Sequence, residues 1–294
     1  MIIIEILKSL FMGIVQGITE WLPISSTGHL LLFNEFIKMT VSNIAQRNED
    51  FFNVFKVFIQ LGSILAVLVL YFHKLNPFST RKTDKEKKQT LSLWGKVLVA
   101  SIPAGVIGFA FNDQIDGVLS EWYVIAATFI IYGILFIWLE SRKTTPRIIS
   151  FPQMNFKTAF FIGIFQMLAL IPGTSRSGAT ILGAVFLGSS RYVAAEFSFF
   201  MAIPAMFGGS GIKLLKFARE NGEKYGSQYP LLFSGIEWLV LITGFITAFI
   251  VSIAVIKLLM GYIKKHDFKV FGYYRIILGA LVILYFLLFN TALK

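Results

Sequence analysis

Apolar residues fill most of this chain in runs of helical length, and two of those runs are interrupted by polar stretches. A helix needs about 20 apolar residues to cross the hydrocarbon core of a bilayer. Six uninterrupted runs meet that requirement, at 54–73, 92–111, 122–140, 193–215, 235–259 and 273–290. The regions 2–37 and 156–189 are apolar but broken in the middle. We therefore predict an all-α integral membrane protein with six transmembrane helices and two re-entrant helical hairpins, because broken backbone is tolerated at membrane depth only inside protein or beside a cavity.

Composition agrees with the membrane class. The 294 residues are 56% hydrophobic and 15% charged, whereas a soluble domain has about 25% charged residues. A formal charge of +11 would suggest nucleic acid in a soluble protein, but here the basic residues cluster in connecting loops, as the positive-inside rule describes. We expect contacts with membrane lipid and no nucleic-acid partner. The chain has no cysteine, which excludes disulfides and thiolate chemistry.

Loop charge predicts the orientation of the spans. Basic loops are expected in the cytoplasm, and the basic loops here are 73–91, 141–157 and 260–272. The acidic loop 112–121 is expected outside, and the alternation also places the loop 216–234 outside despite its lysines. Both chain termini are then predicted outside.

The same alternation gives the two broken regions opposite orientations. The first hairpin enters the membrane from outside and the second from inside. Each half, 1–141 and 142–294, consists of a hairpin followed by three spans, which predicts an inverted-topology repeat within one membrane domain. In such folds the binding site forms where the halves meet, near the bilayer midplane.

The two interruptions are similar in sequence. The stretches Gly13–His29 and Gly163–Thr180 both begin Gly-Ile-x-Gln, continue through apolar residues to a proline, and end in serine, threonine and glycine. Polar and charged residues within apolar membrane segments usually mark a functional site. The interruptions are therefore the candidate site.

The second interruption is suited to phosphate. Gly173 allows the chain to turn into a new helix, and a helix N-terminus with free amides binds anions. Arg176 offers a planar, charged fork for phosphate oxygens. Hydroxyl groups accompany it on Thr174, Ser175, Ser177 and Thr180. We predict that this stretch binds phosphate or pyrophosphate. The alternative is a Ser/Thr helix cap, with Arg176 paired to a carboxylate for folding alone.

The first interruption supplies a carboxylate. Gln16 and Glu20 are four residues apart and thus share one face of a helix. Glu20 could ligate a divalent cation together with Gln16, act as a general base, or only pair with Arg176. Outside both interruptions, we expect a salt bridge between Glu196 and Arg191.

Hydroxyl groups and a histidine follow in the first interruption. Ser26 could be a nucleophile with His29, three residues away, as its proton partner. The alternative for Ser26 is a helix cap. Ser25 and Thr27 are further candidates for substrate binding.

At these residues the chain resembles the undecaprenyl-pyrophosphate phosphatase family, the UppP or BacA bacitracin-resistance proteins. The motifs concerned read Gln16-x-x-x-Glu20, Pro23-Ile-Ser-Ser-Thr-Gly-His29 and Pro172-Gly-Thr-Ser-Arg-Ser-Gly-Ala-Thr180. The resemblance covers nearly the whole chain. It implies a bacterial plasma-membrane enzyme that hydrolyses undecaprenyl pyrophosphate to undecaprenyl phosphate and phosphate, which recycles the lipid carrier of peptidoglycan synthesis.

The resemblance also implies an interlocked inverted-repeat fold, a requirement for a divalent cation (Mg²⁺ or Ca²⁺) and an active site that opens to the extracytoplasmic side. It makes Glu20, Ser26 and Arg176 central to catalysis. Supporting roles fall to Gln16, His29, Ser175 and Thr180. Either Ser26 or a water activated by Glu20 would attack the terminal phosphorus. Gln16 stands where many members have glutamate, which removes one anionic metal ligand.

Two other classes of function fit the same architecture. Inverted repeats with broken helices are usual in secondary transporters, so a transporter or a polyprenyl-phosphate flippase is the main alternative. An assembly scaffold is the other, although it gives no reason for an arginine at membrane depth. We also consider a homodimer.

Overall fold

The computed structural model describes residues 2–119, 121–142, 144–225 and 233–289, with the backbone alone for 111–119 and 220–225. Both chain ends and the middle of the predicted loop 216–234 lie outside the described residues. The described chain is helical and contains no strand, only one isolated bridge. Its long helices are α1 (Ile2–Thr19), α2 (Ser26–Phe36), α3 (Ala45–Leu70), α5 (Asp84–Leu119), α6 (Trp122–Ser141), α7 (Phe156–Met167), α8 (Arg176–Phe186), α9 (Arg191–Tyr225), α10 (Gly235–Tyr262) and α11 (Lys269–Phe289). The short ones are α4 (Phe72–Leu75), η1 (Phe151–Gln153) and η2 (Leu168–Leu170).

All six predicted spans correspond to long helices, and the protein is a multi-pass membrane protein. By length and composition, seven described helices could cross a membrane. They are the six predicted spans, now α3, α5, α6, α9, α10 and α11, together with α1. The candidacy of α1 differs from the prediction, which assigned residues 2–37 to a hairpin whose halves are too short to span.

Two helices extend well beyond the apolar runs that predicted them. α5 covers Asp84–Leu119 around the predicted span 92–111, and α9 continues to Tyr225 past the predicted end at 215. The predicted loop 112–121 is thus helical over most of its length. The flanks 84–91 and 216–225 are rich in lysine and glutamate, which favour helix in water as well. The flank 112–119 contains asparagine, aspartate and glycine, so intrinsic propensity does not account for the helix there.

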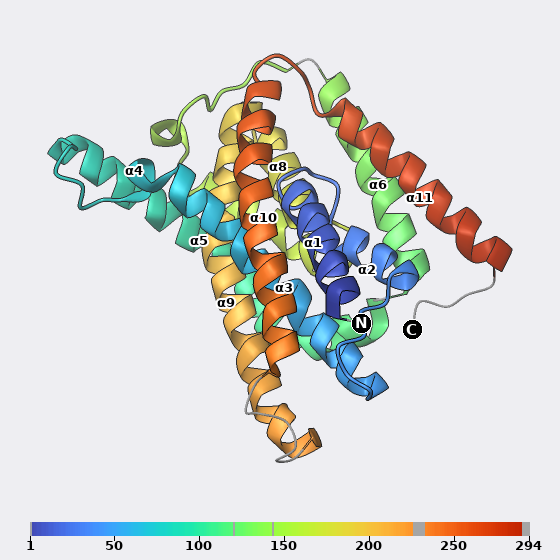
Figure 1. The fold of residues 1–294 in the computed structure, drawn as a ribbon. Coiled ribbons are helices and arrows are strands. Elements are labelled where there is room, and N and C mark those ends of the chain that lie inside the picture. The colour runs from blue at the N-terminus through green and yellow to red at the C-terminus, as the bar shows by residue number, and fades with distance from the viewer. Residues whose placement is uncertain (1, 120, 143, 226–232, 290–294) are drawn as a thin grey trace.

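The two halves of the chain pack against each other in matching pairs. α1, which carries the first Gly-Ile-x-Gln, lies along α10, and α7, which carries the second, lies along α5. α3 contacts α10, and correspondingly α9 contacts α5. α6 and α11 form a further pair at one side of the molecule, and α10 runs beside α1 (Figure 1). Each hairpin therefore packs on a helix of the other half.

The glycine that opens each Gly-Ile-x-Gln motif lies at a close helix contact. A Cβ atom on Gly13 would be 2.7 Å from the carbonyl oxygen of Gly244 in α10. A Cβ atom on Gly163 would be 2.1 Å from the carbonyl oxygen of Ala100 in α5. Small residues let helix backbones approach closely in membranes, where packing drives association. The repeated glycine thus fixes each hairpin against the opposite half.

An aromatic core holds the first interruption in place. Trp21 is fully buried and meets Phe199 of α9 edge to face, with ring centroids 5.1 Å apart. Phe197 and Phe200 of α9 belong to the same buried cluster. Edge-to-face pairs contribute about 0.5–1.5 kcal/mol beyond area burial. The interruption is anchored on the start of α9, next to the second interruption.

Candidate functional site

The two interruptions lie against each other in the structure. The first separates α1 from α2, and the second separates η2 from α8. The hydroxyl of Ser177 is a hydrogen-bond donor to two carbonyl oxygens of the first interruption, those of Glu20 at 3.1 Å and Leu22 at 3.2 Å. Ser177 is therefore a link between the interruptions, and its role in substrate binding stays a prediction.

Both interruptions use the same backbone device to begin their second helix. Ser25 and Ser175 each have φ of 74°, and they are the two non-glycine residues with positive φ in the described chain. Each hydroxyl accepts a hydrogen bond from the amide three residues on, Gly28 at 3.3 Å and Gly178 at 3.0 Å. The left-handed region is uncommon for serine, and such strain is typical of functional sites. Each cap thus satisfies one of the otherwise free amides in the first turn of its helix.

Glu20 is the centre of the site. Its side chain is 4% exposed. Oε2 accepts hydrogen bonds from Gln16 Nε2 at 3.0 Å and from Ser26 Oγ at 2.6 Å. Oε1 accepts a hydrogen bond from Arg176 Nη2 at 3.2 Å. One buried carboxylate thus joins the residues that the sequence proposed for nucleophile, cation ligand and phosphate ligand.

The guanidinium of Arg176 has a hydrogen-bond donor that no protein group uses. Nη1 donates to the carbonyl oxygen of Ser198 at 2.8 Å, while Nε is buried without a hydrogen-bond partner. An unpaired buried donor is costly, and a phosphate oxygen would satisfy it. Thr180 supports this geometry, because its Oγ1 lies 2.6 Å from Ser198 Oγ and donates to the Arg176 carbonyl at 2.8 Å. Ser198, on α9, has no part in either motif and was not predicted.

His29 does not pair with Ser26, contrary to the prediction from their spacing. Its Nδ1 lies 2.7 Å from the carbonyl oxygen of Ser25, and its Nε2 lies 2.7 Å from the hydroxyl of Tyr274 on α11. Because a carbonyl can only accept, Nδ1 bears a proton, and whenever the ring is neutral Nε2 accepts from Tyr274. The hydrogen-bond partner of Ser26 is Glu20 instead.

Arg275, beside Tyr274 on α11, connects both interruptions and was not predicted. It is fully buried. Its guanidinium donates to the carbonyl oxygens of Pro23 at 3.1 Å and Gly173 at 2.8 Å, one in each interruption, and to those of Thr128 and Phe129 in α6. The only sequence signal was an arginine near one end of the apolar run 273–290, where arginine usually reaches the membrane surface.

The remaining predicted residues line or support this arrangement. Gly173 has φ of 87°, and a Cβ there would be 2.1 Å from Thr128 Oγ1, so this turn requires glycine. Thr174, the next residue, is fully buried. Thr27 lies half-buried in the first turn of α2.

The two outlying acidic residues pair differently from the prediction. Glu196 forms its salt bridge with Lys74 at 2.6 Å, and not with Arg191. Arg191 is instead bound through two nitrogens to Glu140 at the end of α6. A spacing of five residues sets Glu196 and Arg191 on different faces of α9, since one turn takes 3.6 residues.

Comparison with known proteins places this chain in a family. The family model described as bacitracin resistance protein BacA matches residues 9–281. The chain belongs to this family. Among similar proteins, "Undecaprenyl-diphosphatase 1" of Clostridioides difficile (strain 630) is 56% identical over 286 residues, which cover 97% of this chain and 98% of the relative. "Undecaprenyl-diphosphatase" of Lactiplantibacillus plantarum (strain ATCC BAA-793 / NCIMB 8826 / WCFS1) is 53% identical over 289 residues, which cover 98% and 100%.

A third relative, "Undecaprenyl-diphosphatase" of Enterococcus faecalis (strain ATCC 700802 / V583), is 52% identical over 289 residues, which cover 98% of this chain and 99% of the relative. The matched region contains both interruptions and Arg275. The family resemblance inferred from the two motifs is confirmed.

Proposed function

We propose that this protein is an undecaprenyl-diphosphatase, which hydrolyses undecaprenyl pyrophosphate to undecaprenyl phosphate and inorganic phosphate. It thereby recycles the lipid carrier for peptidoglycan synthesis and confers resistance to bacitracin. One observation supports this chemistry above the others: Ser26 Oγ donates to Glu20 Oε2 at 2.6 Å, directly beside Arg176. A hydroxyl bound to a buried carboxylate next to a phosphate ligand is the arrangement expected of a nucleophile and its base.

Arg176 and the start of α8 bind the pyrophosphate in this proposal. The unpaired Nε of Arg176 donates to a phosphate oxygen, and the first amides of α8 donate to others, helped by the helix dipole. Glu20 holds Arg176 in place through Nη2. Binding thus aligns the terminal phosphorus with the first interruption, where Ser26 lies.

Ser26 is the nucleophile and Glu20 the general base. As the Ser26 Oγ–phosphorus bond forms, the hydroxyl proton moves to Glu20 Oε2 and the bond from phosphorus to the bridging oxygen breaks. Undecaprenyl phosphate leaves, and Glu20 passes the proton to this departing phosphate. Water then attacks the phosphorus of the phosphoserine while the ionised Glu20 accepts a proton from the water. The Ser26 Oγ–phosphorus bond breaks, Oγ takes that proton back from Glu20, and inorganic phosphate is released. Direct attack by a water that Glu20 activates is the second route, and the short Ser26–Glu20 contact favours the first.

His29 positions the site and does not take the proton of Ser26. Its ring is held between the Ser25 carbonyl and the Tyr274 hydroxyl, and it stacks on the Tyr274 ring with centroids 5.7 Å apart. The strained cap at Ser25 is thereby attached to α11. A role of His29 in proton transfer to the leaving group stays a prediction.

The residues present fit a divalent cation that binds together with the substrate. No group of three histidine, cysteine or acidic side chains capable of holding a metal occurs within the described part of the chain. Gln16 Oε1, however, is buried without a hydrogen-bond partner close to Glu20. Mg²⁺ is commonly held by one or two carboxylates together with substrate phosphates. Glu20 and Gln16 would hold it, and the cation would neutralise charge on the pyrophosphate.

We further propose the inverted-repeat topology, with six spans, two re-entrant hairpins, and the active site and both termini on the extracytoplasmic side. The exchange of packing partners between halves supports it, as do the identical caps at Ser25 and Ser175. Cysteine labelling from either side of the membrane tests it, since the natural chain has no cysteine. That the protein forms a homodimer remains a prediction, which chemical cross-linking tests.

Phosphate release from a long-chain prenyl pyrophosphate by purified protein in detergent, with and without EDTA, separates the enzyme from a transporter or flippase. We expect metal-dependent release that Ser26→Ala lowers at least about a thousandfold, as for other nucleophile removals. Ser101→Ala is the matched control, because that hydroxyl bonds only to its own helix, at Val97. Wild-type turnover in both Ser26→Ala and Arg176→Ala would refute the assignment, and absence of release would favour the transporter.

A further inference from the structure

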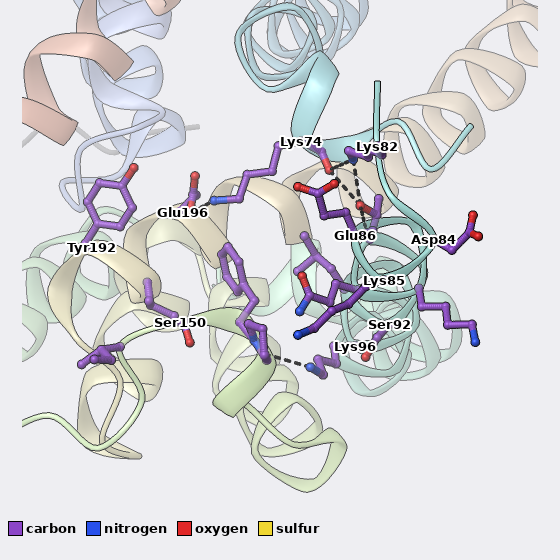
Figure 2. Close-up of a pocket in the computed structure, with 18 residues that line it drawn as sticks. Lys74, Lys82, Asp84, Lys85, Glu86, Ser92, Lys96, Ser150, Tyr192 and Glu196 are labelled. Atoms are coloured by element: carbon purple, nitrogen blue, oxygen red, sulfur yellow. Dashed lines mark hydrogen bonds and ion pairs between the residues drawn. The ribbon is translucent and has the colours of Figure 1, made fainter. Parts of the chain in front are cut away.

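A cleft lies away from the catalytic residues, where the α4–α5 segment, the η1 segment and the start of α9 meet (Figure 2). Its volume is about 890 Å³. Five lysines contribute to its lining: Lys74, Lys82, Lys85, Lys88 and Lys96. The mechanism proposed above uses none of them.

Three of these lysines follow one face of α5. Lys85, Lys88 and Lys96 line the cleft together with Gln89 and Ser92, at spacings of three, four, seven and eleven residues from Lys85, which place them on one side of a helix. Figure 2 shows Lys85, Ser92 and Lys96 along α5, with Ser150 on the opposite wall. The face of a helix that points toward neighbouring segments is usually apolar. Here it is polar and basic, and it borders an open cleft.

The acidic residues of the cleft have partners other than Lys85, Lys88 and Lys96. Glu196 pairs with Lys74 at 2.6 Å. Both the amide and the hydroxyl of Thr83 donate to Glu86 at 2.8 Å. The third, Asp84, faces Lys87, which is not part of the lining. The ion pairs of the described residues therefore leave Lys85 and Lys88 without a carboxylate.

Lys96 gives the second, independent indication of a ligand. This residue is only 5% exposed, yet its Nζ donates to a single protein group, the carbonyl oxygen of Phe151 at 2.9 Å. An ammonium group has three donors, and a buried charge without a counter-ion is unfavourable. An anion in the cleft would supply both the missing acceptors and the missing charge.

The apolar part of the lining indicates what the anion is attached to. Leu93, Phe151 and Pro152 lie in the same cleft as the lysines. On the adjoining turns of α5, Leu91 and Leu98 are more than half exposed, as expected where a helix faces lipid. A ligand with a phosphate head and an apolar body matches this division.

We propose that this cleft binds the phosphate headgroup of an anionic membrane lipid, with Lys85, Lys88 and Lys96 as its ligands. The acyl chains lie along the exposed apolar surface of α5. The cleft is separate from the catalytic site, although the two share the start of α9: Glu196 borders the cleft, and Ser198 contacts Arg176. Lipid binding here does not depend on the proposed phosphatase activity.

Native mass spectrometry of the full chain in detergent tests this, by titration with phosphatidic acid, phosphatidylcholine or inorganic phosphate. We expect a saturable phosphatidic acid adduct and no comparable phosphatidylcholine adduct. The double variant Lys85→Gln with Lys88→Gln should weaken phosphatidic acid binding about tenfold, because each lysine near an anionic headgroup raises the binding affinity several-fold. Arg81→Gln with Lys87→Gln is the control, since it removes the same charge from the same segment outside the lining.

Equal weakening in the control pair would overturn the proposal, because it would indicate diffuse attraction to a basic segment. So would equal adducts with both lipids. Saturation by inorganic phosphate with no gain from the lipid would replace the lipid by free phosphate and equally overturn it. Lys96→Met is a second variant and should weaken phosphatidic acid binding as well. Phosphate release by the Lys85/Lys88 variant should stay at the wild-type rate, which verifies that it is folded.

Discussion

Substitution of Arg275 by lysine tests the role assigned to the cross-link between the interruptions. The guanidinium reaches four carbonyl oxygens at 2.8 to 3.4 Å, among them those of Pro23 and Gly173. Lysine keeps the charge but has a single nitrogen, so at least one of the interruptions loses its contact. A hydrogen bond from a charged donor contributes about 1.5–3 kcal/mol. Loss of one or two such bonds should lower the free energy of unfolding by about 3 kcal/mol.

The effect on catalysis should exceed the effect on substrate binding. Arg275 contacts the backbone that carries Ser26 and Arg176, and a misplacement of 1 Å in a reacting group costs about a hundredfold in rate. We expect kcat to fall by about that factor, with KM changed much less. Phosphate release and thermal unfolding in detergent measure the two effects. The control is Arg142→Lys, an exposed arginine over the Trp138 ring. Wild-type kcat and unfolding temperature in Arg275→Lys would refute the cross-link.

Three further predictions concern the Tyr274 hydroxyl that contacts His29, the close helix contact at Gly163, and the divalent cation. Tyr274→Phe keeps the ring stacked on His29 but removes the hydroxyl, and should lower kcat about tenfold without changing the unfolding temperature; an unchanged rate would contradict a positioning role. Gly163→Ala should destabilise by about 1–3 kcal/mol, because its Cβ would be 2.1 Å from the Ala100 carbonyl, whereas Gly105→Ala meets nothing within 4 Å and should not. EDTA should abolish phosphate release and added Mg²⁺ restore it; release that persists in EDTA would exclude the cation at Glu20.

The sequence was sufficient to predict the helices and to bring the two interruptions together. Apolar runs of span length predicted six of the long helices, and the repeated Gly-Ile-x-Gln indicated which regions are equivalent. Helix ends were less predictable. Hydrophobicity predicts where a helix enters the lipid, whereas α5 extends beyond the apolar run at both ends, at its N-terminal end through lysines and glutamate that favour helix in water. The boundary of the apolar run 92–111 therefore could not give the ends of Asp84–Leu119.

The site was predictable where its residues share a motif. Glu20, Ser26 and Arg176 lie in two short stretches, and their chemistry is complementary. Arg275 was not predictable, since its nearest site partner in sequence is Gly173, 102 residues away, and its acceptors are carbonyl oxygens that no side-chain pattern reveals. His29 shows the limit of spacing arguments. His29 lies three residues from Ser26, which is close enough for contact, but the His29 ring is turned toward Ser25 and Tyr274.

The packing of α1 on α10 has a consequence for biosynthesis. Ser9 of α1 donates to the carbonyl oxygen of Val240 in α10, 231 residues later in the chain. At about 5–20 residues per second for translation, α1 waits on the order of 10–50 s after its synthesis before that partner emerges. Throughout this interval its glycine-lined face, at Gly13 and Gly17, is without α10. A temporary partner, from the insertion machinery or from lipid, must cover the nascent hairpin, and the active site can assemble only after nearly the whole chain has been made.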